Sequence, residues 1–335
     1  MVNKRVKIEN NLINGPSTIE PPQPPTSPTM PTSPTSPTVP AGPDLLYVAN
    51  NNSNSVSVID TDLESVIANI SGFNGPTFLA ADVNLGNVYV TNYFGSSLGI
   101  IDANSNNLVN TITLPGNLPN GVGVNPTNNR VYVTSNPRNV TEIDGTTETI
   151  TTTVETNTGS PQDVVISETL QRLYVPISGN DQLEVFNSAS LVRETIITGL
   201  SPQGYQANIN PVTNRVYVAS LSGGLSVVDG ASNTVITVVP LGAQVTDVDV
   251  NVRTNMVYAV SQNVIYSIDG TNNQIVEQLQ TPGNLRGIRV NSDKNVAYVT
   301  QQSLNNVLII DLASNDIVAQ IPVGQNPFGI EFIQT

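Results

Sequence analysis

The sequence contains no cysteine, no histidine and no tryptophan. The absence of cysteine excludes disulfide bonds and thiolate chemistry, and the absence of histidine removes the commonest general base and metal ligand. Catalysis by a Ser-His-Asp arrangement is therefore impossible. Charged residues make up only 11% of the chain, against about 25% in ordinary soluble domains. A polar but weakly charged surface of this kind is more typical of exported or coat proteins than of cytosolic enzymes.

Basic residues are also scarce, with 12 Lys and Arg against 26 Asp and Glu and a formal charge of −14. Three of the basic and two of the acidic residues precede residue 44, so residues 44–335 hold nine basic and twenty-four acidic residues, a net charge of −15. Such a field repels phosphate backbones and anionic lipid headgroups. We therefore expect neither a nucleic-acid partner nor binding to a membrane surface.

Long apolar runs are missing too. No stretch of about eighteen apolar residues occurs, so no transmembrane helix and no membrane insertion are expected. The N-terminus begins with basic residues, but no apolar run of about seven follows, as a signal peptide of the general secretory route would require. We expect that the chain either stays in the cytoplasm or reaches a cell or spore surface by another path, such as assembly onto a spore within a mother cell.

What the chain has in abundance is one repeated unit. A Tyr-Val or Tyr-Ala pair recurs seven times at intervals of 40 to 43 residues, and an apolar-apolar-Asp step follows about a dozen residues after each pair. The tyrosines are Tyr47, Tyr89, Tyr132, Tyr174, Tyr217, Tyr258 and Tyr298, and the following polar residues are Asp60, Asp102, Asp144, Asn187, Asp229, Asp269 and Asp311. Each unit contains four short stretches of alternating polarity separated by Asn, Gly and Asp turns. The spacing predicts an all-β, seven-bladed propeller with four antiparallel strands in each blade.

The two ends of the repeat region predict how the ring closes. The first unit opens at Leu45–Val48 without a preceding first strand, and the chain ends with an isolated first strand at Phe328–Ile333. We expect the C-terminal strand to become the innermost strand of the N-terminal blade, with Ile330 and Phe332 buried, which makes residues 44–335 one domain.

Residues 1–43 have a different composition. Proline recurs at every third position from 25 to 40, mostly followed by threonine, which favours polyproline II and removes backbone donors. This tail is interpreted as a disordered linker or as a Pro-Thr-Ser stalk, open to O-glycosylation, that holds the propeller away from a surface gripped by a docking peptide in residues 1–14.

The repeats resemble the YVTN-repeat family of seven-bladed propellers. The signature is present at Leu46–Asn50, Arg130–Thr134 and Arg215–Ala219. The resemblance covers residues 44–335 and implies the surface or envelope setting of bacterial and archaeal surface-layer and secreted proteins.

The repeated residues themselves have structural interpretations. Each Asp, and Asn187 in the one exceptional unit, is expected to accept main-chain N–H groups in the turn that follows it. Each repeated Tyr is expected to pack at a blade boundary with its hydroxyl hydrogen-bonded.

The loops that enter the first strands are expected to meet at one end of a central channel, where propellers usually bind their ligands. The predicted mouth is mostly neutral and polar: Thr77, Asn120, Gln162, Asp163, Gln203, Thr246, Asp247, Arg286 and Phe328. Arg286 could anchor a carboxylate or sugar hydroxyls, or could pair with an acidic side chain.

The loops between second and third strands add Tyr93, Phe94, Arg138, Asp181 and Leu221. Tyr93 and Phe94, which precede Gly95, are candidates for an aromatic contact platform, unless they pack beneath their loop.

Three functions are compatible with these features. The leading hypothesis is a non-catalytic propeller on a cell or spore surface that binds a protein, peptide or glycan, needs no cofactor or metal, and is monomeric unless assembled through its tail. The alternative is a lactonase or lyase with a central divalent cation held by Asp163, Asp247 and neighbouring amide oxygens. A third is a periplasmic or cytosolic small-molecule-binding protein.

Overall fold

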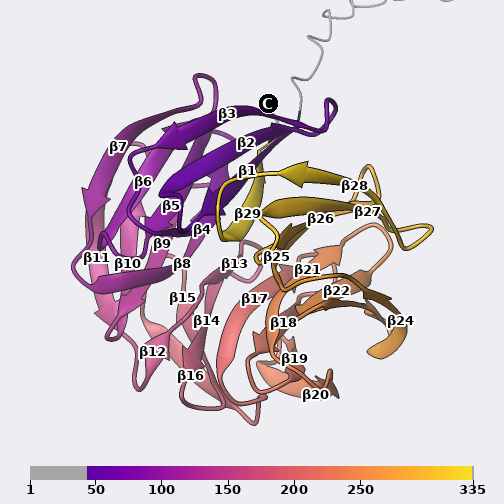
Figure 1. Cartoon of the computed structure of the whole chain (residues 1–335). Helices are drawn as coiled ribbons and strands as arrows, with labels where there is room; N and C mark the ends of the chain where they lie inside the picture. The colour runs from indigo at the N-terminus through magenta and orange to yellow at the C-terminus, as the bar shows by residue number, and fades with distance from the viewer. Residues whose placement is uncertain (1–43, 334–335) are drawn as a thin grey trace, which may run out of the picture. The chain divides into compact units, whose positions relative to one another are not determined.

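A computed structural model describes residues 44–333, which form seven antiparallel sheets arranged around a common axis (Figure 1). All 29 elements of the described residues are strands, so the predicted all-β propeller of seven blades is confirmed; six blades have the predicted four strands, and in blade 4 the inner strand is split into β12 and β13. In the described part of the chain, no helix is long and apolar enough to cross a membrane. The predicted docking peptide and stalk of residues 1–43 lie outside the described residues.

The blades take their strands almost in chain order. Blade 1 contains β29 (Pro327–Ile333), β1 (Leu45–Asn50), β2 (Ser55–Asp60) and β3 (Ser65–Ser71). Blade 2 contains β4 (Pro76–Asp82), β5 (Asn87–Asn92), β6 (Ser97–Asp102) and β7 (Asn107–Thr113). Blade 3 contains β8 (Asn117–Asn125), β9 (Arg130–Asn136), β10 (Asn139–Asp144) and β11 (Thr149–Glu155). Blade 4 contains β12 (Ser160–Pro161), β13 (Val165–Ser167), β14 (Arg172–Ser178), β15 (Gln182–Asn187) and β16 (Arg193–Thr198).

The remaining three blades follow the same scheme. Blade 5 contains β17 (Gly204–Asn210), β18 (Arg215–Ser220), β19 (Gly224–Asp229) and β20 (Thr234–Pro240). Blade 6 contains β21 (Val245–Asn251), β22 (Met256–Ser261), β23 (Val264–Asp269) and β24 (Gln274–Gln280). Blade 7 contains β25 (Leu285–Asn291), β26 (Val296–Gln301), β27 (Asn306–Asp311) and β28 (Asp316–Pro322).

The turn after the third strand of each blade is held by the repeated acidic residue, as predicted. In blade 1 the Asp60 carboxylate accepts the N–H groups of Asp62 and Leu63 at 2.9 and 3.0 Å. Four of the other aspartates also accept two such N–H groups, Asp269 accepts one from Thr271, and Asn187 accepts the N–H groups of Ala189 and Ser190. These carboxylates are therefore structural turn residues rather than a ring of catalytic groups.

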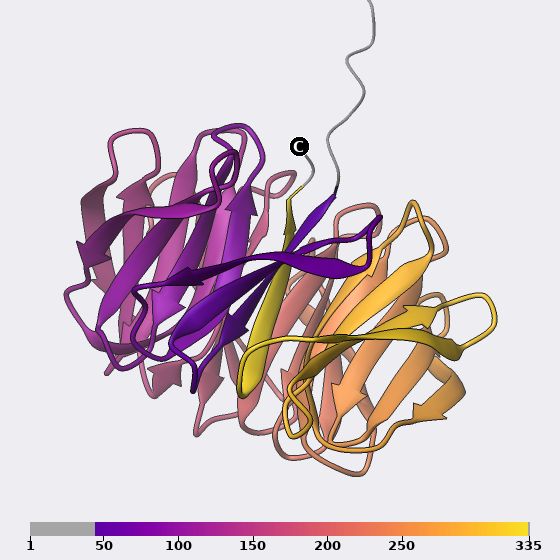
Figure 2. The same cartoon turned by 45° about the horizontal axis from the view of Figure 1, so that its top comes forward.

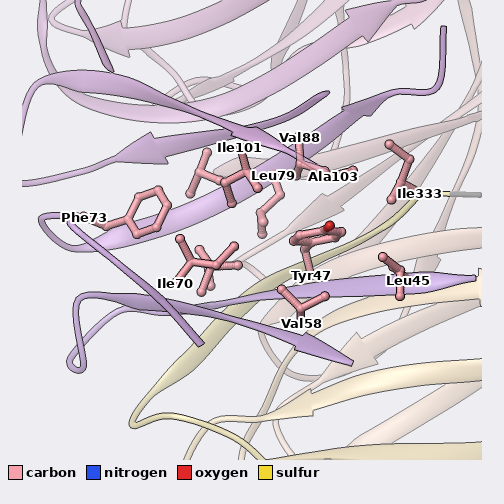
Figure 3. Packing of buried hydrophobic residues seen from close by; sticks show 13 residues of the cluster. Leu45, Tyr47, Val58, Ile70, Phe73, Leu79, Val88, Ile101, Ala103 and Ile333 are labelled. Atoms are coloured by element: carbon pink, nitrogen blue, oxygen red, sulfur yellow. The ribbon is translucent and has the colours of Figure 1, made fainter. Parts of the chain in front are cut away.

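The repeated tyrosines lie at blade boundaries, as predicted, but the predicted hydroxyl hydrogen bond is wrong for Tyr89 and Tyr217, whose hydroxyls are buried without a partner among the described residues. Tyr47 is fully buried in a cluster with Leu79 and Val88 of blade 2 (Figure 3). The Tyr174 hydroxyl donates to the Gly230 carbonyl of blade 5 at 2.8 Å. A side-chain carbon at Gly230 would lie 2.8 Å from that hydroxyl, so the Asp-Gly turn leaves the space that the tyrosine of the preceding blade needs.

The C-terminal strand closes the ring, which confirms the predicted closure. Strand β29 pairs antiparallel with β1, with Ile330 opposite Val48 (Figure 2). Ile330 is fully buried, whereas Phe332 is only partly buried because its ring also faces a cavity of the channel. Across the same seam, the Lys294 ammonium lies 3.2 Å from Asp44 and thus ties blade 7 to the first described residue.

Candidate ligand-binding site

The first strands of the seven blades surround the axis, because each packs against the first strand of the next blade (Figure 1). Two separate cavities open among these strands. One, here named the mouth cavity, has a volume of about 360 Å³ and lies where the chain enters the inner strands. The other, here named the channel cavity, has a volume of about 440 Å³ and lies farther along the same strands.

The mouth cavity brings together most of the predicted site. Five of the nine predicted mouth residues line it: Thr77, Asn120, Gln162, Arg286 and Phe328. Both residues of the predicted aromatic platform, Tyr93 and Phe94, also line it. Sequence reasoning missed four further lining residues: Asn51, Phe78, Asn136 and Tyr205.

Arg286 lies against an aromatic cluster formed by Phe78, Tyr205 and Phe328. Its guanidinium carbon lies 4.1 Å from the centre of the Phe328 ring and 4.8 Å from that of Tyr205, both within cation–π range. Phe78 packs edge-on against both rings, at 5.2 Å from Phe328 and 6.1 Å from Tyr205. Arg286 also donates to the Tyr205 hydroxyl. Burial raises the pKa of Tyr205 to about 12, so this hydroxyl stays protonated at neutral pH.

Arg286 has no acidic partner within residues 44–333, although the protein carries an excess of acids. Among residues 44–333, seven of the nine basic side chains form ion pairs, and Arg286 and Arg215 do not. The Arg286 Nε atom is buried without a hydrogen-bond partner. The sequence left two roles open for Arg286: anchoring a ligand or pairing with an acidic side chain. Among the described residues, Arg286 makes no such pair.

Tyr93 and Phe94 form the rim of the mouth cavity. Their rings pack edge to face with centres 5.2 Å apart, and Phe94 remains 63% exposed. The Phe94 ring lies against Gly75, where any side chain would collide with it. The other predicted loop residues take no part in the cavity lining, and Arg138 instead pairs with Glu155 at 2.7 Å.

Two of the predicted mouth residues are placed elsewhere. Gln203 precedes β17, adopts a φ of 58° and is exposed, and Tyr205 occupies the place in the cavity that was predicted for it. The Thr246 side chain is buried and donates to the Arg286 carbonyl at 3.0 Å, so it supports the site without lining it.

Asp163 and Asp247 do not line the mouth cavity either. Asp163 accepts the N–H of Ala207 in blade 5, and Asp247 accepts the N–H of Ile288 in blade 7, both at 2.9 Å. Burial raises the pKa of both carboxyls, that of Asp163 to about 7. These two aspartates join neighbouring inner strands.

The predicted metal ligands do not fit a divalent cation. Calcium takes about six to eight oxygen ligands, whereas Asp163 and Asp247 are committed to main-chain donors and Asp247 also lies 3.4 Å from Arg289. Within residues 44–333 no group of three or more acidic residues is placed to hold a metal ion.

The channel cavity has two unlike sides. One side carries Asn208, Asp249, Arg289 and Glu331, which are linked in pairs across blades 5 to 6 and 7 to 1 at 2.7 and 3.1 Å. The other side is formed by β4, β8, β13 and the residues just before β13, and it is apolar apart from the predicted site residue Asp163. Sequence reasoning missed the four polar residues of the first side. Their signal is that each stands between two apolar residues in an inner strand, in β17, β21, β25 and β29 respectively.

Comparison with known proteins supports the fold. No family model matches this chain, and no curated protein matches it. Many solved structures share the architecture, among them the following three. Hydrazine synthase of Kuenenia stuttgartiensis superposes with a TM-score of 0.71 at 14% identity, over 79% of this chain and 97% of that one. A functionally unknown protein from Desulfotomaculum acetoxidans DSM 771 gives 0.76 at 13% identity, over 86% and 98%. Dihydro-heme d1 dehydrogenase NirN in complex with DHE gives 0.61 at 16% identity, over 85% and 74%.

At these identities the comparisons establish the β-propeller and not a shared activity. The seven-bladed fold implied by the YVTN resemblance is confirmed, and membership of that family stays a prediction.

Proposed function

We propose that this protein is a non-catalytic binding propeller that takes a protein, peptide or glycan of a cell or spore surface into its mouth cavity. The observation that carries the proposal is Arg286, which is held between the rings of Tyr205 and Phe328 without an acidic partner and faces an open cavity. A fixed, unpaired cation with aromatic walls and neutral amides around it is the composition of a recognition site.

The lining of the mouth cavity supports binding over catalysis. It contains no aspartate, glutamate, histidine, cysteine or lysine, so none of its side chains is a usual general base at neutral pH. The acids nearest to this end, Asp163 and Asp247, are engaged with main-chain N–H groups. No cofactor is required by the proposed role.

The surface setting rests on composition and on the YVTN resemblance. Charged residues are only 11% of the chain, and a Pro-Thr-rich segment precedes the propeller in the sequence. We propose that this segment attaches the propeller to the surface.

The enzyme alternative receives less support. Two of the structural neighbours are named for enzymes, a hydrazine synthase and a dihydro-heme d1 dehydrogenase, but this chain lacks a fitting metal site at the predicted aspartates and has no histidine.

The proposal is tested with fluorescently labelled full-length protein on glycan and peptide arrays. We expect saturable binding to a defined set of ligands, and a loss of that binding in the Phe328→Ala variant, which removes one wall of the Arg286 site. The Val318→Ala variant, altered on the exposed outer strand of blade 7, serves as the control. An absence of binding on both arrays, or equal binding by both variants, would contradict the proposal.

A further inference from the structure

The charge balance around the mouth cavity indicates the charge of its ligand. Residues 44–335 carry a net charge of −15, yet Arg286 forms no ion pair among the described residues, while the exposed Arg253 pairs with Asp293 and the partly buried Arg193 pairs with Glu184. Arg215, the other arginine without an acid, donates to the Gly270 carbonyl of the next blade. Arg286 is therefore the cation that remains free to meet an anionic group in a concave site.

The geometry determines which edge of Arg286 can meet that group. Tyr205 and Phe328 cover the guanidinium group, so an additional partner must approach in its plane. The Nε–H is buried and closed to a ligand, so the edge that a ligand can reach is the one formed by the two Nη atoms: Nη2 also donates to Tyr205, and Nη1 has no partner among the described residues. A carboxylate binds an arginine edge with two parallel N–H···O bonds, and the stacked rings hold that edge in place before the ligand arrives.

The other residues that line the mouth cavity indicate which kind of molecule bears the carboxylate. Phe78 and Phe94 offer apolar ring surface. Four neutral side-chain amides each make a hydrogen bond within the protein and leave their remaining donor and acceptor sites for a ligand: Asn51, Asn120, Asn136 and Gln162. Aromatic faces suit the C–H faces of sugar rings, and amides suit their hydroxyl groups. One cation in a strongly acidic propeller favours a ligand with a single negative charge over a polyanion.

We infer that the mouth cavity recognises a glycan ending in a single carboxylate-bearing sugar, a uronic acid residue, whose carboxylate binds the Arg286 edge while its ring packs on the aromatic cluster. This inference rests on the proposed binding function and narrows its ligand class.

The test is isothermal titration of the full-length protein with a disaccharide ending in glucuronic acid and with its methyl ester, which keeps the ring and removes the charge. We expect the free acid to bind at least about tenfold more tightly than the ester, because a charge-assisted hydrogen bond is stronger than a neutral one. A peptide with a free C-terminal carboxylate and its amide form the second pair of ligands.

Variants locate the effect. Arg286→Gln is expected to weaken binding of the free acid by about 10- to 100-fold and to abolish discrimination against the ester, and Arg286→Lys is expected to retain part of it. Arg253→Gln removes the same charge at a site that is 65% exposed and should change nothing. Circular dichroism establishes that each variant is folded.

The outcomes separate this inference from the proposed function. Equal binding of acid and ester, with array binding intact, overturns the inference and leaves the binding function standing. Binding of the free-acid peptide but not of the sugar overturns the glycan assignment. Failure of every array ligand overturns the binding function itself.

Discussion

The Asp163 carboxylate of blade 4 accepts the main-chain N–H of Ala207 in blade 5 at 2.9 Å, inside the central channel. Asp163 lies in the gap between β12 and β13, where the inner strand of blade 4 is interrupted. Asp249 makes the equivalent contact from blade 6 to the N–H of Val290 in blade 7 at 2.6 Å. Buried carboxyls thus form hydrogen bonds between the inner strands of neighbouring blades, which belong to different sheets.

These carboxyls predict how stability depends on pH. Burial raises the pKa of Asp163 and of Asp249 to about 7 in the folded protein, against about 3.9 in an unfolded chain. Between these values the folded state binds protons that the unfolded state does not, so the unfolding free energy falls as pH rises, by up to about 1.4 kcal/mol per pH unit for each group. We expect a higher Tm at pH 5 than at pH 8.

The matched variant is Asp163→Asn, whose amide oxygen can still accept the Ala207 N–H and which carries no charge. It should reduce the pH dependence without abolishing it, because Asp249 still titrates, whereas Asp181→Asn in an exposed loop should leave it unchanged. Main-chain hydrogen bonds lower the pKa of the turn aspartates Asp144 and Asp229. Their contribution to the unfolding free energy is therefore constant between pH 5 and pH 8 and is lost only on stronger acidification. A Tm that rises from pH 5 to pH 8 would refute this assignment.

A pair of tyrosines tests the role of the blade-boundary hydroxyl. Tyr174→Phe removes the hydrogen bond to the buried Gly230 carbonyl and should lower the unfolding free energy by about 1 kcal/mol. The Tyr89 hydroxyl is buried without a partner, so Tyr89→Phe should be neutral or slightly stabilising. Urea unfolding of both variants measures the difference, and equal losses would show that the hydroxyl contact is not what matters.

Gly121 tests how closely the inner strands approach each other. A side-chain carbon at this position would collide with the main chain and carboxylate of Asp163 in blade 4. We expect Gly121→Ala to lower stability by about 1 to 3 kcal/mol, the usual cost of overpacking. At Gly204 the nearest atom would be 3.3 Å away, so Gly204→Ala should be milder. Thermal unfolding compares the two, and the opposite order would contradict the described packing.

Closure of the ring predicts the effect of Ile330. This side chain is fully buried between blades 7 and 1, so Ile330→Ala should lower the unfolding free energy by about 2 to 5 kcal/mol. Val318 on the outer strand of blade 7 is 56% exposed, and Val318→Ala should cost little. If denaturant titration gave both variants the same midpoint, β29 would not be the strand that holds the ring closed.

Much of the fold was predictable because its chemistry is local and repeated. The repeated Asp or Asn residue holds the same turn in each blade, and the tyrosines pack at the same boundary. The repeat pattern therefore occurs seven times, and the seven copies together predict the fold although each copy alone is a weak indication. The closure was predictable from the incomplete units at Leu45–Val48 and Phe328–Ile333, which complement each other.

The site was less predictable. The predicted mouth residues that do line the mouth cavity share one position in their blades. Each lies five residues before the last residue of its inner strand: Thr77, Asn120, Gln162, Arg286 and Phe328. In blade 5 the inner strand ends at Asn210, so the same offset gives Tyr205 rather than the predicted Gln203. The sequence contained this information, because the Asn210 side chain accepts a main-chain N–H of its turn as Asn125 does in blade 3.

The orientations of Asp163 and Asp247 could not be predicted in the same way. They depend on the distance to the inner strand of the neighbouring blade, which no single repeat encodes.

The most direct test of the mouth cavity as a non-catalytic binding site is calorimetric titration of the full-length protein, and of its Arg286→Gln variant, with the strongest ligand from the arrays. We predict one site per chain, no heat after saturation, and affinity at least about tenfold lower in the variant, a loss of about 1.4 kcal/mol. Unchanged affinity in the variant, or heat that continues to flow after saturation because the ligand is being converted, would contradict the account.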